Sequence, residues 1–256
     1  MQFWLGIHHP VWLERVDVPT MVSFRWLRAR KQLPRARAAW VQDSGGFSEL
    51  GLHGCYATSA REYAERTRRH LDEIGQLTWA ACQDHMCEDA ILARTGSTVA
   101  QHQVRTLESY LDLRELAPEV PWLPVLQGQV LDDYRRHVDL YTAAGVDLRQ
   151  APVVGLGTVC RRQHTLVAVR LIQGLSQLDL KLHGFGLKVT ALQRCADLLH
   201  SADSMAWGID GRYPQGGRCK VVRDHKQCAN CLDWALRWRG QLMTQLGQGR
   251  LFAELA

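Results

Sequence analysis

The sequence has no run of about 18 apolar residues, the length that a membrane-spanning helix needs. Its first residues do not form a charged and then apolar leader that ends at a small-residue cleavage site. It also has neither a phosphate-binding loop nor a dinucleotide-binding fingerprint, which argues against two common classes of nucleotide-dependent enzyme. We therefore expect a cytoplasmic protein whose chemistry needs no nucleotide cofactor.

Lysine is scarce: the 31 basic residues are 26 arginines and 5 lysines. The chain has a net charge of +5. Arginine presents a planar fork that suits phosphate, so this bias favours a nucleic-acid partner, although a GC-rich genome would also produce it. The densest basic segment, FRWLRARKQLPRARAAW, contains no acidic residue. Its basic residues are Arg25, Arg28, Arg30, Lys31, Arg35 and Arg37. The alternative interpretation of this segment is a solvent-exposed helix face.

Short apolar runs alternate with longer stretches of helical period, the pattern of a parallel sheet with helical crossovers. The predicted strands are 2–7, 20–24, 38–42, 78–82, 122–126, 152–156, 180–185 and 201–205. The predicted helices are 59–75, 97–117, 130–145, 161–177 and 189–199. Ser59 followed by Glu62 predicts a capping box at the start of the helix 59–75, and Gly75 predicts its end. Eight strands favour an α/β fold of the (β/α)8 TIM-like barrel type, with a hairpin expected near 43–58.

No proline- or serine-rich linker divides the 256 residues, so we expect a single domain over 1–256. After about residue 207 the pattern changes to a loop rich in glycine and cysteine, and then to one tryptophan-rich helix, CLDWALRWRGQLMTQLG. We predict that 208–246 forms a C-terminal zinc-binding loop and helix, as an appendage on the barrel.

Polar residues follow each predicted strand, and in a parallel barrel the carboxyl ends of all strands meet at one face, where active sites lie. These residues include His8, His9, Asp43, Ser44, Gln83, Asp84, Gln127, Gly155, Gly157, His183, Gly186, Asp203 and Ser204. Asp43, Asp84 and Asp203 would share one pocket, where like charges and burial push their pKa values apart. One carboxylate can then act as a nucleophile while another acts as a general acid. The chemistry that this predicts is cleavage and re-formation of a glycosidic bond.

The order of several short motifs resembles that of the tRNA-guanine transglycosylase superfamily. The motifs are QDSGGF at 42–47, VLQG at 125–128, GLG at 155–157, HGFG at 183–186 and SADSMAW at 201–207, before a Cys/His cluster. HHPVWL, WAACQDHMCE and HKQCANC make the whole chain most similar to the DNA-modifying branch, the DpdA-type transglycosylases that place 7-deazaguanine bases in DNA.

The resemblance implies a glycosyltransferase, a pentosyltransferase that exchanges guanine in DNA for a 7-deazaguanine base such as preQ0. In that reaction Asp203 matches the nucleophile that attacks the sugar C1′ and displaces guanine, and Asp43 matches the general acid and base. Asp84 matches the carboxylate that recognises the purine edge, and Phe47 an aromatic wall that stacks on the base. The full substrate-binding set that the resemblance implies is Asp84, Gln127, Gly155, Leu156, Gly157, Phe47, Ser44 and Gly186.

The implied partners are DNA, with its target guanine flipped or single-stranded, and the free 7-deazaguanine base. Further partner proteins remain open. The chain has no obvious RNA-binding extension, which argues against tRNA as the substrate. The same chemistry on tRNA is kept as the alternative. A non-catalytic zinc-containing DNA-binding module is the alternative from another class.

The segment CKVVRDHKQCANC offers four ligands of the kind that tetrahedral Zn²⁺ prefers, Cys219, His225, Cys228 and Cys231. Four protein ligands leave no position for water, so the predicted zinc is structural. The superfamily also carries a Cys3His zinc site here, usually with its histidine after the cysteines. No histidine follows Cys231, so His225 is the predicted ligand and His200 its substitute.

His8 and His9 raise a further alternative, a metal-dependent hydrolase barrel whose first strand ends in a His-x-His pair. Because the two histidines are adjacent in the sequence, they are expected to point to opposite sides of the strand. A pair placed in this way cannot chelate one ion.

Overall fold

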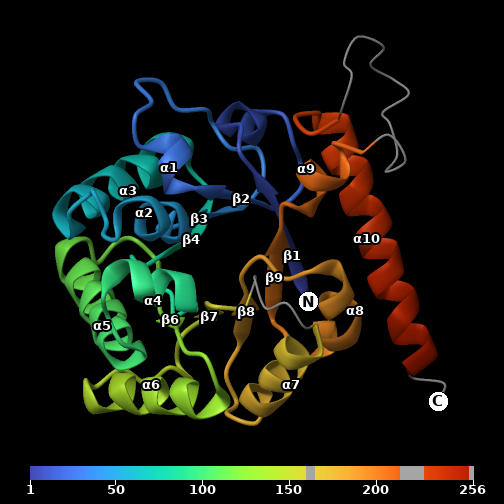
Figure 1. The fold of residues 1–256 in the computed structure, drawn as a ribbon. Coiled ribbons are helices and arrows are strands. Elements are labelled where there is room, and N and C mark those ends of the chain that lie inside the picture. The colour runs from blue at the N-terminus through green and yellow to red at the C-terminus, as the bar shows by residue number, and fades with distance from the viewer. Residues whose placement is uncertain (160–164, 214–227, 254–256) are drawn as a thin grey trace.

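The computed structural model of the chain describes residues 1–159, 165–213 and 228–253, and has the α/β alternation that the sequence predicts (Figure 1). All of its strand pairs are parallel. The strands are β1 (Gln2–Ile7), β2 (Thr20–Ser23), β3 (Trp40–Asp43), β4 (Leu77–Ala81), β5 (Trp122–Leu123), β6 (Val125–Leu126), β7 (Val154–Leu156), β8 (Leu182–Gly184) and β9 (Ser201–Ser204). Each predicted strand overlaps an observed one.

The nine strands form a nearly closed, barrel-like sheet in the order β5-β4-β3-β2-β1-β9-β8-β7-β6. Its two outermost strands, β5 and β6, are consecutive in the chain and are separated only by Pro124. Trp122 pairs with Ala80 of β4, whereas Val125 pairs with Gly155 of β7. Proline has no N–H group for the ladder, so it divides the strand predicted at 122–126 into two short ones. The chain itself therefore bridges the gap in the barrel, consistent with a TIM-like fold.

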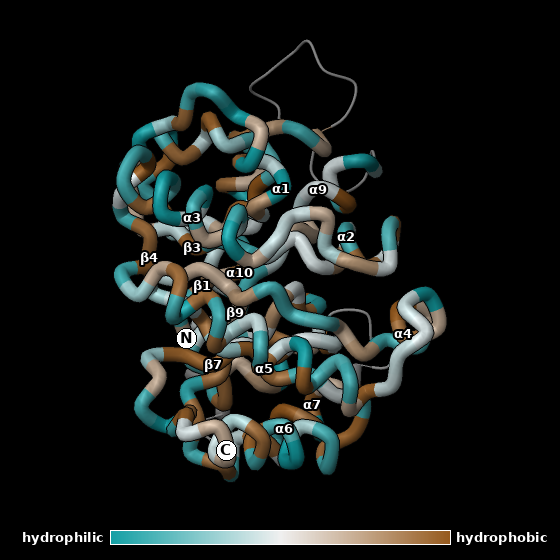
Figure 2. The backbone as a smooth tube through the Cα atoms, turned by 90° about the vertical axis from the view of Figure 1, so that its left-hand side faces the viewer, coloured by the Kyte–Doolittle hydropathy of each residue, from teal (hydrophilic) through white to brown (hydrophobic). Residues whose placement is uncertain are grey.

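Several helices connect successive strands and surround the sheet (Figure 1). They are α3 (Ala60–Ile74), α5 (Val99–Leu116), α6 (Leu131–Ala143), α7 (Thr165–Ser176) and α8 (Val189–Cys195), which is followed by the short 3-10 helix η2 (Ala196–Leu198). Ser59 accepts a hydrogen bond from the Glu62 N–H at 3.2 Å, and Gly75 ends α3, as predicted. Along these helices hydrophobic and hydrophilic residues alternate (Figure 2), as expected where one helix face packs on a barrel.

The prediction of a hairpin near 43–58 is wrong, because this segment contains the helix α2 (Gly46–His53). Gly45 adopts a left-handed conformation, with φ of 79°, and turns the chain from the end of β3 directly into the helix. Gly54, with φ of 73°, ends the helix. The two glycines thus flank a helix and do not form the tight turn between two strands.

Several short helices complete the connections. The 3-10 helix η1 (Pro10–Glu14) and helix α1 (Phe24–Leu27) follow β1 and β2, and α4 (Asp89–Thr95) follows β4. Helix α4 packs against α2. In Figure 2 both helices lie on the right, at the carboxyl end of the strands, whereas the N-terminus lies on the left. The side with α2 and α4 is therefore where a barrel enzyme places its active site.

At the C-terminal end, α9 (Ala206–Asp210) and the long α10 (Leu232–Ala253) pack beside the barrel (Figure 1). The Trp234 indole N–H donates to the Trp207 carbonyl at 2.9 Å, and the Trp238 indole N–H donates to the Asp210 carboxylate at 2.8 Å. These bonds fix α10 to α9, as expected for tryptophans whose buried N–H groups require acceptors. The predicted helix is thus present, whereas most of the loop before it lies outside the described residues.

Aromatic side chains fill the interior of the barrel. Trp4 of β1 and Trp79 of β4 meet edge to face with ring centroids 6.1 Å apart, and the His183 ring lies 4.9 Å from Trp79. All three residues are buried, and Trp4 and Trp79 belong to one continuous hydrophobic core. No helix within the described residues is both long and apolar enough to cross a membrane.

Candidate active site

The structure brings Asp43, Asp84 and Asp203 together at the carboxyl end of the barrel. Asp43 is the last residue of β3, Asp84 lies just beyond the end of β4, and Asp203 lies near the end of β9. Burial is the main cause that raises the pKa of Asp43 and of Asp84; the charge of Asp203 adds to the rise at Asp43, and the charge of Asp43 adds to the rise at Asp84. Such charge effects require carboxyl groups that lie close to one another. Asp84 and Asp203 are buried, with 8% and 6% of their surface exposed.

Asp84 is held at both carboxylate oxygens. The Ser44 hydroxyl donates to Oδ1 at 2.7 Å, and the Gln127 side-chain amide donates to Oδ2 at 2.5 Å. Gln127 is fixed in turn by the Thr158 hydroxyl, which donates to its Oε1 at 2.6 Å. Burial raises the pKa of Asp84 to about 7, assisted by the charge of Asp43 and opposed by the hydrogen bonds from Ser44 and Gln127. Each carboxylate oxygen retains a lone pair for a further donor.

Tyr56 and Thr158 support this network, and the sequence did not identify either residue. The Tyr56 hydroxyl donates to the Asp84 carbonyl at 2.8 Å and lies 3.3 Å from the Ser44 hydroxyl. Thr158 has a left-handed backbone, with φ of 56°, and accepts a hydrogen bond from the Cys87 N–H. A β-branched residue rarely adopts this conformation. Neither residue belongs to a periodic pattern, and of the two only Thr158 directly follows a recognised motif, GLG.

Asp43 lies on the turn that leads into α2. Its Oδ2 accepts the Gly45 N–H at 3.0 Å. Burial raises the pKa of Asp43 to about 6, opposed by hydrogen bonds from the Ser23 side chain and from backbone N–H groups and reinforced by the charge of Asp203. A carboxyl group that titrates near neutral pH can both donate and accept a proton during a reaction.

Asp203 is oriented from β8 and the turn after it. The Gly186 N–H donates to Asp203 Oδ1 at 2.8 Å, and the buried His183 Nε2 lies 3.4 Å from the same oxygen, without hydrogen-bond geometry. Gly186 has φ of 55°, a left-handed conformation that favours glycine. His183 Nδ1 is paired with the Ser201 hydroxyl at 2.9 Å. Gly186 was predicted to bind substrate. In the structure its N–H instead bonds Oδ1 of Asp203, the predicted nucleophile.

The GLG segment lies beside Gln127, but its backbone donors belong to the sheet. The Gly155 N–H donates to the Pro124 carbonyl and the Gly157 N–H to the Leu126 carbonyl, each at 2.9 Å. A Cβ atom on Gly157 would lie 2.1 Å from Gln127 Nε2, so a larger residue there would displace the Gln127 amide. Leu156 is buried within β7. These residues pack beside Gln127, whose side-chain amide is held by Asp84 and Thr158.

Phe47, in the first turn of α2, is 38% exposed at the carboxyl end of the barrel. A hydrophobic side chain in this position is available to a flat ligand. Ser44, the first residue after β3, contacts Asp84 as described above.

The expectation that His8 and His9 point to opposite sides of a strand is wrong. Strand β1 ends at Ile7, so the alternation of a strand does not reach them, and their ring centroids lie 4.3 Å apart. His8 Nε2 is instead paired with the Asn230 side-chain oxygen at 2.7 Å, and its ring stacks on Trp207 with centroids 5.4 Å apart. This histidine joins the end of β1 to the turn before α10.

The basic segment at 25–37 is mostly loop, because α1 ends at Leu27. Arg28 is paired with Glu49 at 3.1 Å, and Arg35 donates to the Asp72 and Glu73 carbonyls at the end of α3. Arg37 is paired with Asp17 at 3.0 Å. These three arginines have structural partners.

The remaining basic residues of this segment, Arg25, Arg30 and Lys31, are exposed. Arg25 also lies beside Gly45, because a Cβ atom on that glycine would be 3.6 Å from Arg25 Cβ. The structure therefore places one exposed cation next to the turn that carries Asp43.

Of the predicted zinc ligands, Cys228 and Cys231 are described, and Cys219 and His225 lie outside the described residues. Both described cysteines are buried, with 3% and 9% of their surface exposed, in the turn before α10. Cys228 donates its N–H to the Gly211 carbonyl, beyond the carboxyl end of β9. His200 precedes the amino end of β9, so the substitute ligand lies at the opposite end of the strand. Two buried thiols in one turn fit half of a Zn²⁺ site.

A search of curated proteins found no match. A protein-family model matches residues 1–251, essentially the whole chain, and describes the family as DpdA, DeoxyPurine in DNA protein A. This match agrees with the resemblance in the motifs and points to an enzyme that modifies DNA. The chain belongs to the DpdA family.

Proposed function

We propose that this protein is a DNA-guanine transglycosylase, which exchanges guanine in DNA for a 7-deazaguanine base such as preQ0 through a covalent intermediate on Asp203. The observation that carries the proposal is the group of three carboxylates at one end of the barrel, each held differently. Asp203 is oriented by Gly186, Asp43 has a pKa of about 6, and Asp84 is fixed by Ser44 and Gln127. Family membership supports DNA as the substrate.

In the first half of the reaction, Asp203 attacks C1′ of the target nucleotide. The bond between C1′ and N9 of guanine breaks as a bond from C1′ to a carboxylate oxygen forms, and Asp43 supplies a proton to the departing guanine. Because the Gly186 N–H occupies Oδ1, the second oxygen of Asp203 is the one placed to attack. The ester retains the glycosyl group while the bases exchange, which predicts ping-pong kinetics.

In the second half, the 7-deazaguanine base gives its N9 proton to Asp43 and attacks C1′. The new glycosidic bond forms as the ester to Asp203 breaks, so the carboxylate is regenerated and the configuration of the sugar is retained. Electrons and protons balance over the cycle, and no oxidant or nucleoside triphosphate takes part. This agrees with the absence of nucleotide-binding motifs from the sequence.

Asp84 and Gln127 are the groups that we assign to recognition of the purine. An ionised Asp84 can accept hydrogen bonds from the N1–H and the exocyclic amine, and the second N–H of the Gln127 amide can donate to the base carbonyl. Phe47, exposed on α2, would stack on the ring. The target nucleotide has to leave the helical stack to reach this site, and Arg25, Arg30 and Lys31 are exposed cations that can contact the flanking phosphates.

We also propose a structural Zn²⁺ held by Cys219, His225, Cys228 and Cys231. When bound, the ion supplies a fixed tetrahedral crosslink and takes no part in the chemical steps. The burial of Cys228 and Cys231 in the turn before α10 supports this assignment.

The reaction is tested with labelled preQ0 and either DNA or tRNA, using the wild-type protein and Asp203→Asn. The wild type should label DNA and form a protein–DNA adduct that survives denaturation, and Asp203→Asn should reduce both below detection because it lacks the nucleophile. Asp197→Asn is the matched control, since Asp197 is exposed on η2 and should leave both unchanged. Thermal unfolding of each variant would verify its fold.

Three outcomes contradict the proposal. Full activity in Asp203→Asn would rule out a covalent intermediate on this residue. Labelling of tRNA alone would replace DNA by tRNA as the substrate, with the same chemistry. Labelling of neither nucleic acid would favour the non-catalytic DNA-binding module.

A further inference from the structure

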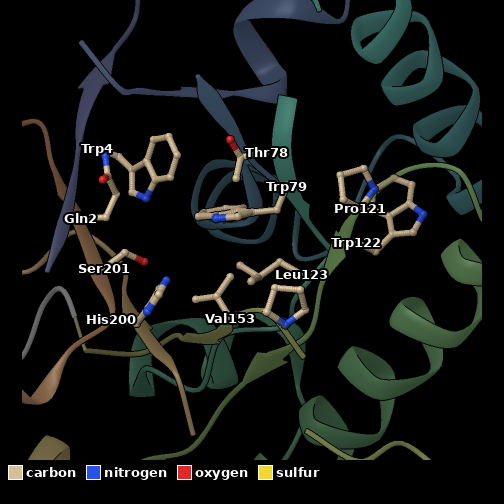
Figure 3. A pocket seen from close by; sticks show the side chains of 11 residues that line it. Gln2, Trp4, Thr78, Trp79, Pro121, Trp122, Leu123, Val153, His200 and Ser201 are labelled. Carbon is tan, nitrogen blue, oxygen red and sulfur yellow. The ribbon is translucent and has the colours of Figure 1, made fainter. Parts of the chain in front are cut away.

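A cavity of about 190 Å³ opens among residues at the amino ends of several strands, at the end of the barrel opposite the carboxylates, and Figure 3 shows the side chains that line it. Its walls include the side chains of Trp4, Trp79 and Trp122, together with Ser201 at the start of β9. Thr78 lies at the rim and is exposed. A cavity of roughly 150 Å³ with apolar walls takes up a single aromatic ring, so this one has room for one small ring system.

The cavity wall contains a polar group without a partner. Trp4 is 5% exposed, and its indole nitrogen has no hydrogen-bond partner among the described residues. In Figure 3 this nitrogen and the Ser201 hydroxyl face the same space beside Trp79. Buried indole N–H groups are normally bonded, so this one indicates a site for an acceptor that the protein does not supply.

The residues that line the cavity include no carboxylate. His200, at the rim, has a pKa below its usual range because of burial and the nearby charge of Lys181. An aromatic cage that binds a cation normally gains from negative charge nearby, and here the closest charge is positive. The lining therefore favours an uncharged ligand.

The cavity is connected to the carboxylates through two residues. The Ser201 hydroxyl is bonded to His183 Nδ1 at 2.9 Å, and His183 Nε2 lies 3.4 Å from Asp203 Oδ1. Trp4 is also the direct partner of Asp203 in the pairing of β1 with β9. An acceptor that takes the Ser201 hydroxyl hydrogen leaves Nδ1 to carry the ring proton. Nε2 then presents a lone pair to Asp203 in place of an N–H group.

We propose that this cavity is a second ligand site, which binds a flat, uncharged ring with one hydrogen-bond acceptor and reports its occupancy to Asp203 through Ser201 and His183. The acceptor bonds the Trp4 N–H and the Ser201 hydroxyl, and the ring packs on Trp79 and Trp122. The binding part is independent of the proposed function, whereas its consequence for base exchange rests on the role of Asp203.

The binding test uses quinoline, which has one ring acceptor and is uncharged at neutral pH, and naphthalene, which has the same shape without the acceptor. By ligand-detected NMR titration, quinoline should bind the wild type at least tenfold more tightly than naphthalene. Trp4→Phe keeps an aromatic wall but loses the N–H, and should remove most of that difference. Thr78→Trp should close the mouth and abolish binding, and Thr78→Ser is its control.

The coupling test monitors the ring nitrogens of His183 by ¹⁵N NMR, with His183→Gln to identify their signals. Quinoline should shift the ring proton from Nε2 to Nδ1 in the wild type. In Ser201→Ala quinoline should still bind, and this response should be lost.

The proposed site would be overturned by any of three results. These are no binding of quinoline, equal binding of the two probes, or binding that persists in Thr78→Trp. Binding without a response of His183 would overturn the connection to Asp203. Neither measurement requires DNA or a 7-deazaguanine base, so a failure here is distinct from a failure of the base-exchange assay.

Discussion

At the level of single residues, the three aspartates are chemically identical but differ in their surroundings. Asp203 receives one backbone N–H from Gly186, whereas Asp84 receives two side-chain donors. The pKa of Asp43 is raised by burial and further by the charge of Asp203. Hydrogen bonds, burial and neighbouring charge thus give the three carboxyl groups different surroundings, which the three proposed roles require.

The raised pKa of Asp84 predicts how stability changes with pH. Its pKa is about 7 in the folded protein, above the ordinary value of 3.8. The folded state keeps the proton where the unfolded chain loses it, so the stabilisation is complete below about pH 4 and is lost as the pH rises through 7. Asp84→Asn does not titrate. Between pH 5 and pH 8 the unfolding free energy of Asp84→Asn should therefore fall by about 2 kcal/mol less than that of the wild type.

This prediction is checked by urea unfolding at a series of pH values. Asp112→Asn on α5, where the aspartate is exposed, is the control and should behave like the wild type. Parallel curves for Asp84→Asn and the wild type would mean that Asp84 titrates normally. At pH 8 the variant should also fail to select guanine-like bases, because the amide replaces one acceptor oxygen by a donor.

The sequence predicted the acidic residues of the site and some of their partners, among them Ser44, Gln127 and Gly186. Asp43 and Asp84 follow predicted strands and Asp203 lies within one, and the geometry of parallel strands then brings them to one face. Tyr56 and Thr158, which the sequence did not identify, reach the same network from loops. Such contacts depend on side-chain directions across elements distant in sequence, which no local pattern encodes.

At the level of elements, the strands and long helices were predictable because each has a strong period and clear ends. The exception is the segment after β3. Two consecutive glycines indicate a turn but do not specify whether a strand or a helix comes next, and the left-handed conformation of Gly45 leads into α2. Helix α2 also carries Phe47, the residue that we propose stacks on the base. Likewise, Pro124 was expected within one strand, but its missing N–H divides that strand in two.

Helix α2 allows a test of base stacking with a matched control on the same element. Phe47→Ala should raise the KM for preQ0 by about 5- to 150-fold, since stacking of a base on an aromatic side chain contributes roughly 1–3 kcal/mol. Leu52→Ala, at a residue that is 55% exposed near the other end of α2, should leave KM unchanged.

Steady-state exchange kinetics at several preQ0 concentrations would measure both variants. Phe47 is 38% exposed, so little folding stability should be lost on its replacement. An unchanged KM in Phe47→Ala would show that Phe47 does not contribute to binding of the base.

At the level of the whole molecule, the C-terminal segment is connected to the carboxyl end of the barrel by several contacts. Asn230 meets His8, Cys228 bonds the Gly211 carbonyl, and Trp234 bonds the Trp207 carbonyl. These bonds hold the turn that contains the described cysteines next to the ends of β1 and β9. A crosslink there would therefore stabilise the barrel end that carries Asp203, and not merely the helix α10.

The proposed zinc ion makes this argument testable. Freshly purified protein should contain one Zn²⁺ per chain, and Cys228→Ser should lose the metal because a hydroxyl is a poor replacement for a thiolate ligand. The same variant should unfold about 5 °C lower, the shift that roughly 2 kcal/mol produces in a domain of this size. Cys55→Ser is the control, since Cys55 is exposed near the end of α2 and should retain both zinc and stability.

Metal analysis and thermal unfolding of the three proteins provide the measurement. Less than stoichiometric zinc in the wild type, or full zinc in Cys228→Ser, would contradict the ligand set. Loss of zinc without a change in unfolding temperature would have a different meaning. The ion would then be bound, but the contacts of Asn230, Cys228 and Trp234 would be sufficient to hold the segment. Because Zn²⁺ is placed outside the chemical steps, Cys228→Ser assayed well below its unfolding temperature should retain base exchange.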